Sequence, residues 1–156
     1  MTLSKAKLKS LGANLIGRKA KDASTLSAIE KLFDVELPEA YKNALVDIGG
    51  GIFFDKGARF TSDDKIPLQR SDGTISLSML FGLGRGKHSI LKQMQIFKDH
   101  PFNAGAATIG DSPGGNFLFG DKYGKVFFWD HETDRIYLVA KSLNEFFGRL
   151  EPEPSS

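Results

Sequence analysis

The stretch from residue 105 to 132, GAATIGDSPGGNFLFGDKYGKVFFWDHE, constrains the fold more than any other part of the chain. Two of its segments, residues 116–120 and 125–130, are rich in β-branched and aromatic side chains, and the turn around Gly124 separates them. Such side chains favour strands, and a short glycine-containing turn joins antiparallel neighbours. The stretch therefore predicts a sheet hairpin, and its few polar positions indicate that both faces of the hairpin are covered.

Helix-like and strand-like patterns occupy the rest of the chain. Apolar residues at helical spacing predict helices over residues 25–34, 38–48, 89–98 and 143–150, the last begun by a capping box at Ser142 and Glu145. Apolar segments bounded by turn residues predict strands over 52–55, 58–61, 65–68, 75–81, 106–109 and 136–140, with a turn at residues 56–57. We therefore expect an α+β fold: a single domain whose twisted, largely antiparallel sheet carries two N-terminal helices, a middle helix and a C-terminal helix.

Composition excludes several classes of protein. A chain of 156 residues, 40% of them hydrophobic, is long enough to bury one proper core. The absence of cysteine excludes a disulfide scaffold and a cysteine-based zinc site. No apolar run approaches the roughly 20 residues that span a bilayer, and the N-terminus lacks the apolar segment of a secretory signal. We expect a cytoplasmic protein without a membrane partner.

Charge is distributed unevenly along the chain. Residues 1–22 hold six basic residues against one acidic residue, so the remainder is mildly acidic although the net charge is +2. We therefore divide the chain into a basic N-terminal arm (1–24), a domain (25–150) and a tail (151–156). A basic arm can attract nucleic acid, but this one lacks interleaved aromatic residues, which disfavours that role. A solvated leader is the alternative interpretation of the arm.

No motif in the chain predicts catalysis. The loop GDSPGG resembles the surroundings of a trypsin-like nucleophile, but Pro113 removes an N–H directly after Ser112, where oxyanion donors are needed. The glycines at residues 82–86 do not match the phosphate-binding fingerprints. The three histidines lack the spacing of metal ligands. We therefore expect no catalytic residue, no metal and no cofactor, and we place Trp129 in the core rather than at a base-stacking surface.

Several short motifs follow one another in a recognisable order. They are IEKLFDVELPEAY at residues 29–41 with glycines at 49–51, LFGLG at 80–84, IGD, GGN, GKV and WDHE between 109 and 132, and SLNEFF at 142–147. This order resembles the SUKH superfamily, which joins fungal cell-wall-synthesis regulators to bacterial immunity proteins of polymorphic toxin systems. The resemblance covers residues 25–150. Leu143 departs from it, because the family often has phenylalanine there.

The resemblance implies an α+β binding protein rather than an enzyme, and many bacterial members are thought to neutralise a cognate toxin, often a nuclease. Nucleases present basic clefts, to which an acidic surface is complementary. We therefore expect partner-binding residues among the acids in turns beside the hairpin, namely Asp111, Asp121, Asp130, Glu132 and Asp134. The alternative is that these acids only form turns. The competing functions are a regulatory scaffold in a larger assembly and a nucleic-acid binder that uses the basic arm.

Overall fold

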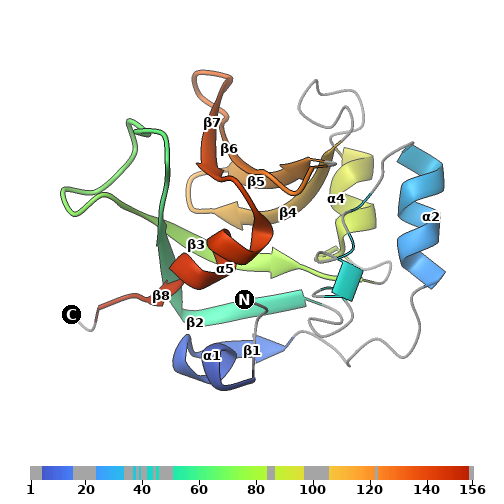
Figure 1. Cartoon of the computed structure of the whole chain (residues 1–156), viewed down its shortest axis with the longest axis horizontal. Coiled ribbons are helices and arrows are strands. Elements are labelled where there is room, and N and C mark those ends of the chain that lie inside the picture. Colours follow the sequence, from blue (N-terminus) through green and yellow to red (C-terminus); the bar gives the residue numbers. More distant parts are fainter. Residues whose placement is uncertain are drawn as a thin grey trace.

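The computed structural model describes residues 5–15, 24–33, 37, 39, 42–43, 45, 51–83, 87–96, 106–121 and 123–154. A sheet forms the body of the molecule, α5 crosses it, and α2 and α4 lie together at one end (Figure 1). The elements are α1 (Lys5–Ser10), β1 (Ala13–Leu15), α2 (Ser24–Phe33), β2 (Gly51–Thr61), β3 (Thr74–Phe81), α4 (Ile90–Ile96), β4 (Ala106–Ser112), β5 (Asn116–Asp121), β6 (Val126–Asp130), β7 (Arg135–Ala140), α5 (Leu143–Arg149) and β8 (Glu151–Pro152).

The sheet is an antiparallel meander in which strands β1 to β7 pair in chain order and β8 pairs with β2. This arrangement confirms the predicted single α+β domain. The predicted hairpin is also confirmed, because β5 pairs with β6 through Phe117 opposite Trp129 and Phe119 opposite Phe127. The Gly124 turn adopts a φ of 85°, which glycine tolerates better than other residues.

The predicted turn at residues 56–57 is wrong. β2 runs unbroken from Gly51 to Thr61, and only its pairing register with β3 shifts, between Phe53 and Ala58. Gly57 has a φ of 77°, so the strand is irregular at this point without reversing its direction. The sequence pattern marked an irregularity correctly but could not distinguish it from a hairpin.

The predicted strand at residues 65–68 is also wrong, since this segment belongs to the loop between β2 and β3. The loop covers the free edge of β7, where the backbone N–H groups of Asp63 and Asp64 donate to the carbonyls of Val139 and Leu138, both at 2.9 Å. Pro67 has no N–H for a ladder. The loop thereby protects an edge that would otherwise expose unpaired backbone groups.

Helices α2, α4 and α5 follow the sequence closely, whereas α1 lies in the basic arm, where no helix was predicted. α5 begins at Ser142, whose Oγ accepts a hydrogen bond from the Glu145 backbone N–H at 3.1 Å. Its Phe146 packs edge-to-face on Phe60 of β2, with ring centroids 5.5 Å apart. The predicted helix over residues 38–48 lies largely outside the described residues. No described helix is long and apolar enough to cross a membrane.

Apolar side chains form two clusters on opposite faces of the hairpin. Val126 and Phe128 belong to the main core, whereas Trp129 packs with Phe119 in a second cluster that Phe117 and Phe127 border. Alternate residues of a strand point to opposite faces, which produces this separation. Trp129 is therefore buried, as expected, and both faces of the hairpin are at least partly covered.

The two ends of the chain pack on the sheet. Leu11, just after α1, is buried in the main core, and β1 pairs with β2 through Asn14 opposite Phe53. At the other end β8 extends the sheet beside Arg59. The division into arm, domain and tail stays a prediction, but these described parts of the arm and tail contribute to the sheet.

We expect Glu153→Gln to lower stability in a pH-dependent way. The Arg70 guanidinium donates to both oxygens of Glu153 (2.9 and 2.8 Å), and this hydrogen bonding holds the pKa of Glu153 below its ordinary 4.5. A depressed carboxyl pKa contributes stability above the unfolded-state pKa, and this contribution is lost as the pH falls through the folded-state value. Urea midpoints of variant and wild type should therefore differ at neutral pH and converge below that value.

The matched control is Glu151→Gln, two residues before Glu153 and on β8. The Glu151 side chain is 58% exposed in its pair with Arg59, whereas that of Glu153 is 15% exposed. Exposed ion pairs contribute little, so the midpoint of Glu151→Gln should barely move. A midpoint difference for Glu153→Gln that stays constant with pH would contradict the ionic explanation.

Candidate binding site

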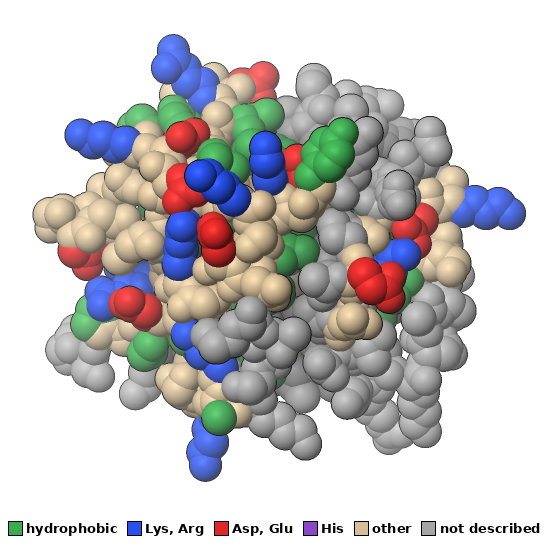
Figure 2. Space-filling model, viewed as in Figure 1, with side chains coloured by type: hydrophobic (Ala, Val, Ile, Leu, Met, Phe, Trp, Pro, Cys, Tyr) green, Lys and Arg blue, Asp and Glu red, His purple; other side chains and the backbone are tan. Residues whose placement is uncertain are grey.

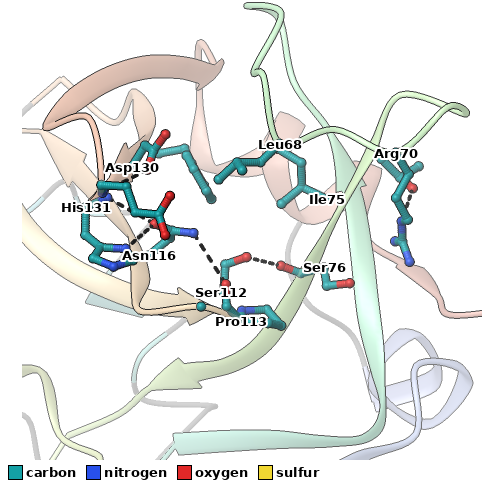
Figure 3. A pocket seen from close by; sticks show the side chains of 13 residues that line it. Leu68, Arg70, Ile75, Ser76, Ser112, Pro113, Asn116, Asp130 and His131 are labelled. Atoms are coloured by element: carbon teal, nitrogen blue, oxygen red, sulfur yellow. Dashed lines mark hydrogen bonds between the residues drawn. The ribbon is translucent and has the colours of Figure 1, made fainter.

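A pocket lies where β3 and β4 separate. These strands pair only at Met79 opposite Asp111 and Leu80 opposite Gly110, and further along the Ser112 hydroxyl donates to the Ser76 carbonyl at 2.6 Å. Beyond this contact a pocket of about 290 Å³ opens between the start of β3, the β4–β5 turn and the turn that follows β6 (Figure 3). We call it the front pocket.

The walls of the front pocket differ in chemistry. Leu68, Ile75 and Phe128 line it with apolar surface, and Phe128 is fully buried. Its polar lining comes from Ser112, Asn116, Asp130, His131 and Glu132 on the hairpin side, and from Arg70, Thr74 and Ser76 on the other. An apolar lining with a few placed polar groups is the usual chemistry of a binding site.

Asn116 holds the polar side of the front pocket in place. Its Oδ1 accepts the His131 backbone N–H at 3.0 Å and lies 2.9 Å from His131 Nδ1 (Figure 3). Gly115 has a φ of 83°, and a Cβ on it would stand 3.5 Å from the His131 ring. Asp130 Oδ1 accepts the backbone N–H of Glu132 at 3.0 Å. This turn is therefore pre-organised by side-chain hydrogen bonds.

The unpaired charge of the front pocket is acidic. Arg70 is engaged by Glu153, and its Nε also donates to Thr74 Oγ1 at 3.1 Å. The exposed Glu132 has no ion pair among the described residues and stands beside the buried Asp130. The pocket can therefore accept a cationic or hydrogen-bond-donating group.

The described residues show no catalytic arrangement at Ser112. Its hydroxyl donates to a backbone carbonyl, and His131 bonds to Asn116 instead. Residues 113–115 form the predicted turn. The described residues also hold no group of three or more metal-ligating side chains.

The five predicted partner-binding acids do not form one patch. Asp130 and Glu132 line the front pocket, and Asp134 lies in the same turn after β6. Asp121 lies at the opposite end of the hairpin, about 17 Å away at the usual rise of a strand. Asp111 points away from the face that carries its neighbour Ser112, because successive strand residues alternate.

Two of these acids also have local structural roles. Asp121 Oδ1 accepts the backbone N–H groups of Tyr123 and Lys125, both at 2.9 Å. Asp134 has a φ of 56° and accepts the Trp129 Nε1–H at 2.7 Å. Such contacts are those of turn-forming aspartates. Their place in a binding surface therefore stays a prediction.

Asp111 lies in a second, separate hollow of about 510 Å³, which we call the back hollow. Its lining residues are Asn14, Phe53, Ser78, Met79, His88 and Asp111. Burial raises the pKa of Asp111 to about 6, against the opposing effect of backbone hydrogen bonds at Met79 and at Asp111 itself. The other lining residues were not predicted from the sequence; they lie on β1, β2 and β3 and before α4. No local pattern connects positions so far apart in the chain.

The surface charge is mixed. Acidic and basic side chains lie side by side on the face shown in Figure 2. Nucleic-acid binders carry basic side chains gathered on one face or along one helix. Among the described side chains, this face has no such concentration.

Comparison with known proteins finds a matching protein family and a similar protein. The model of the SMI1 / KNR4 family (SUKH-1) matches residues 22–149. The SPbeta prophage-derived uncharacterized protein YokK of Bacillus subtilis (strain 168) is 29% identical over 143 residues, which cover 83% of this chain and 74% of the relative. No solved structure matches the chain.

Proposed function

The chain belongs to the SMI1 / KNR4 family (SUKH-1), and we therefore propose that it is a non-enzymatic binding protein that neutralises a toxin by covering its active site. The expected toxin is a nuclease, as the resemblance to bacterial immunity proteins implies. The observation that carries this proposal is the acidic side of the front pocket, where Asp130 and Glu132 stand without a basic partner among the described residues.

Electrostatic complementarity supports this choice of partner. A nuclease cleft is basic because it binds phosphates. An acidic surface that enters the cleft speeds the encounter and competes with the nucleic acid. Glu132 is exposed, so it can reach a partner, whereas Asp130 is buried and holds the turn. Glu132 is therefore the acid of this pair that contacts the toxin.

Rigidity of the front pocket supports the proposal as well. His131 is held by Asn116, and Ser112 connects β4 to β3. A surface that is already ordered loses little conformational entropy on binding. Such a site favours tight binding of one partner through a fixed set of contacts.

We expect Glu132→Lys to weaken binding of a candidate nuclease toxin encoded beside this gene. Charge reversal at the rim of an interface lowers the association rate, and the loss is greatest at low salt. Calorimetry and stopped-flow mixing over a salt series measure both effects. Glu132 is the better test than Asp130, since a lysine at the buried Asp130 position would also disturb the fold.

The control is Glu151→Lys, which makes the same charge change on the exposed strand β8. It should leave the affinity of the toxin and its salt dependence unchanged. Toxin binding that is equally strong, and equally sensitive to salt, in wild type and Glu132→Lys would remove the front pocket from the interface. Failure of the wild-type protein to bind or inhibit the toxin would contradict the proposed function for that toxin.

A further inference from the structure

A row of directly paired residues crosses the sheet on the face that carries the back hollow. From β1 to β7, its members are Asn14, Phe53, Met79, Asp111, Phe117, Trp129 and Ile136. Directly opposed residues of paired strands share a face. Asp111 is the acid of this row, and it stands between Met79 and Phe117.

The Asp111 carboxylate is incompletely satisfied. Its Oδ1 is buried and has no hydrogen-bond partner within the part of the chain that the structure describes. No described basic group lies within 4.0 Å of it. A buried carboxylate without a cation or a full set of donors is costly. The oxygen that lacks a donor belongs to a side chain that lines an open hollow.

The other walls of the back hollow suit a cation that has an apolar stem. Phe53 is 45% exposed and offers apolar surface, and the largely buried Met79 lies beside it in the row. Asn14 and Ser78 add neutral polar groups. His88 is the other titratable residue among those described that line the hollow. A volume of about 510 Å³ leaves ample room for one long side chain.

We propose that the back hollow is a docking site for an arginine side chain of a protein partner, with its guanidinium pairing with the Asp111 carboxylate and lying against Phe53. The positive charge of a guanidinium complements the Asp111 carboxylate, which has no cation beside it among the described residues. Guanidinium is less strongly hydrated than ammonium and stacks on aromatic rings, so arginine fits this site better than lysine. The inference rests on the proposed function as a protein-binding module and adds a second contact surface to it.

The buried Asp111 carboxylate lowers the stability of the free protein, which agrees with this role. Its pKa is raised from 3.8 to about 6, so the folded protein holds a proton in this pH window that the unfolded chain has lost. Stability therefore falls as the pH rises through the window. We expect Asp111→Asn to have a higher urea midpoint than wild type at neutral pH, and the two midpoints to converge below 3.8.

The test is a titration of the full-length protein with N-acetyl-arginine amide, followed by NMR of the Asp111 side-chain carboxyl and the Met79 amide. We expect a saturable shift and a lower Asp111 pKa at saturation. Asp111→Asn should weaken binding by about tenfold or more, the usual effect of losing a charge-assisted hydrogen bond. N-acetyl-norleucine amide, which has no charge, should produce no saturable shift.

The control variant Glu151→Gln removes an acid that lines neither the front pocket nor the back hollow, and it should bind the arginine probe as wild type does. Absence of saturable binding to wild type, or equal binding to Asp111→Asn, would overturn the inference. This outcome is independent of the toxin assay, which depends on Glu132. The back hollow can therefore fail while the proposed function stands, and the reverse also holds.

Discussion

Phe128→Ala is expected to lower the free energy of unfolding by about 3–5 kcal/mol, the usual cost of removing a buried phenylalanine. Phe128 is completely buried in the main core and also lines the front pocket. The truncation removes apolar contacts and leaves a cavity beneath Leu68 and Ile75, which line the same pocket. A loss of this size is a large share of the roughly 5–15 kcal/mol that typical domains possess. Urea unfolding followed by tryptophan fluorescence measures it.

Phe127→Ala is the matched control, because it makes the same change one residue away. Phe127 is half-buried on the other face of β6 and stacks on Phe119, with centroids 5.4 Å apart. Loss of such an aromatic pair should cost only about 1 kcal/mol. Equal losses for the two variants would contradict the assignment of Phe128 to the core face and Phe127 to the other.

Gly110→Ala is expected to destabilise the protein by about 1–3 kcal/mol, in the range of overpacked cores, and to weaken both candidate sites together. A Cβ at Gly110 would stand 2.7 Å from the backbone carbonyl oxygen of Met79, closer than real Cβ contacts. β3 and β4 pair only at Gly110 and its neighbour Asp111, so pushing them apart disturbs the front pocket and the back hollow at once. Thermal unfolding measures the loss of stability, toxin binding reports on the front pocket, and the arginine titration reports on the back hollow.

Gly120→Ala is the control for Gly110→Ala. Gly120 is also buried, on the neighbouring strand β5, but the nearest atom to an added Cβ would be Ile109 Cγ2 at an ordinary 3.7 Å. Because alanine restricts the unfolded chain more than glycine, this variant should be neutral or slightly more stable. A Gly110→Ala protein as stable as Gly120→Ala would show that β3 and β4 are not held closely at Gly110.

Local chemistry explains which elements could be predicted. The hairpin of β5 and β6 follows from aromatic segments on either side of Gly124, and α5 follows from the Ser142 cap. In each case the residues that decide the structure lie within a few positions of one another. The same logic failed at Gly57, because glycine at positive φ serves both a hairpin turn and an irregular strand, and only the pairing partner distinguishes them.

The candidate sites bring together residues that are far apart in the sequence. Asp130 and Glu132 could be proposed from their turn, but Leu68 and Arg70 join them only because the loop after β2 reaches the same pocket. Asp111 was predicted to share one surface with these two acids. Consecutive residues of a strand point to opposite faces, so Asp111 points away from the face of Ser112 and lines the back hollow instead.

By itself, the sequence determined the α+β class, the central hairpin, helices α2, α4 and α5, and the absence of a recognisable catalytic motif, because these follow from periodicity, caps and motif spacing. Only the tertiary structure decided that β2 is continuous and that the five acids are divided between different places. It alone brought Asn14, Phe53 and His88 around the unsatisfied oxygen of Asp111. The physical reason is that strand register and pairing are set by the packing of the whole sheet, and they place residues side by side that are distant in sequence.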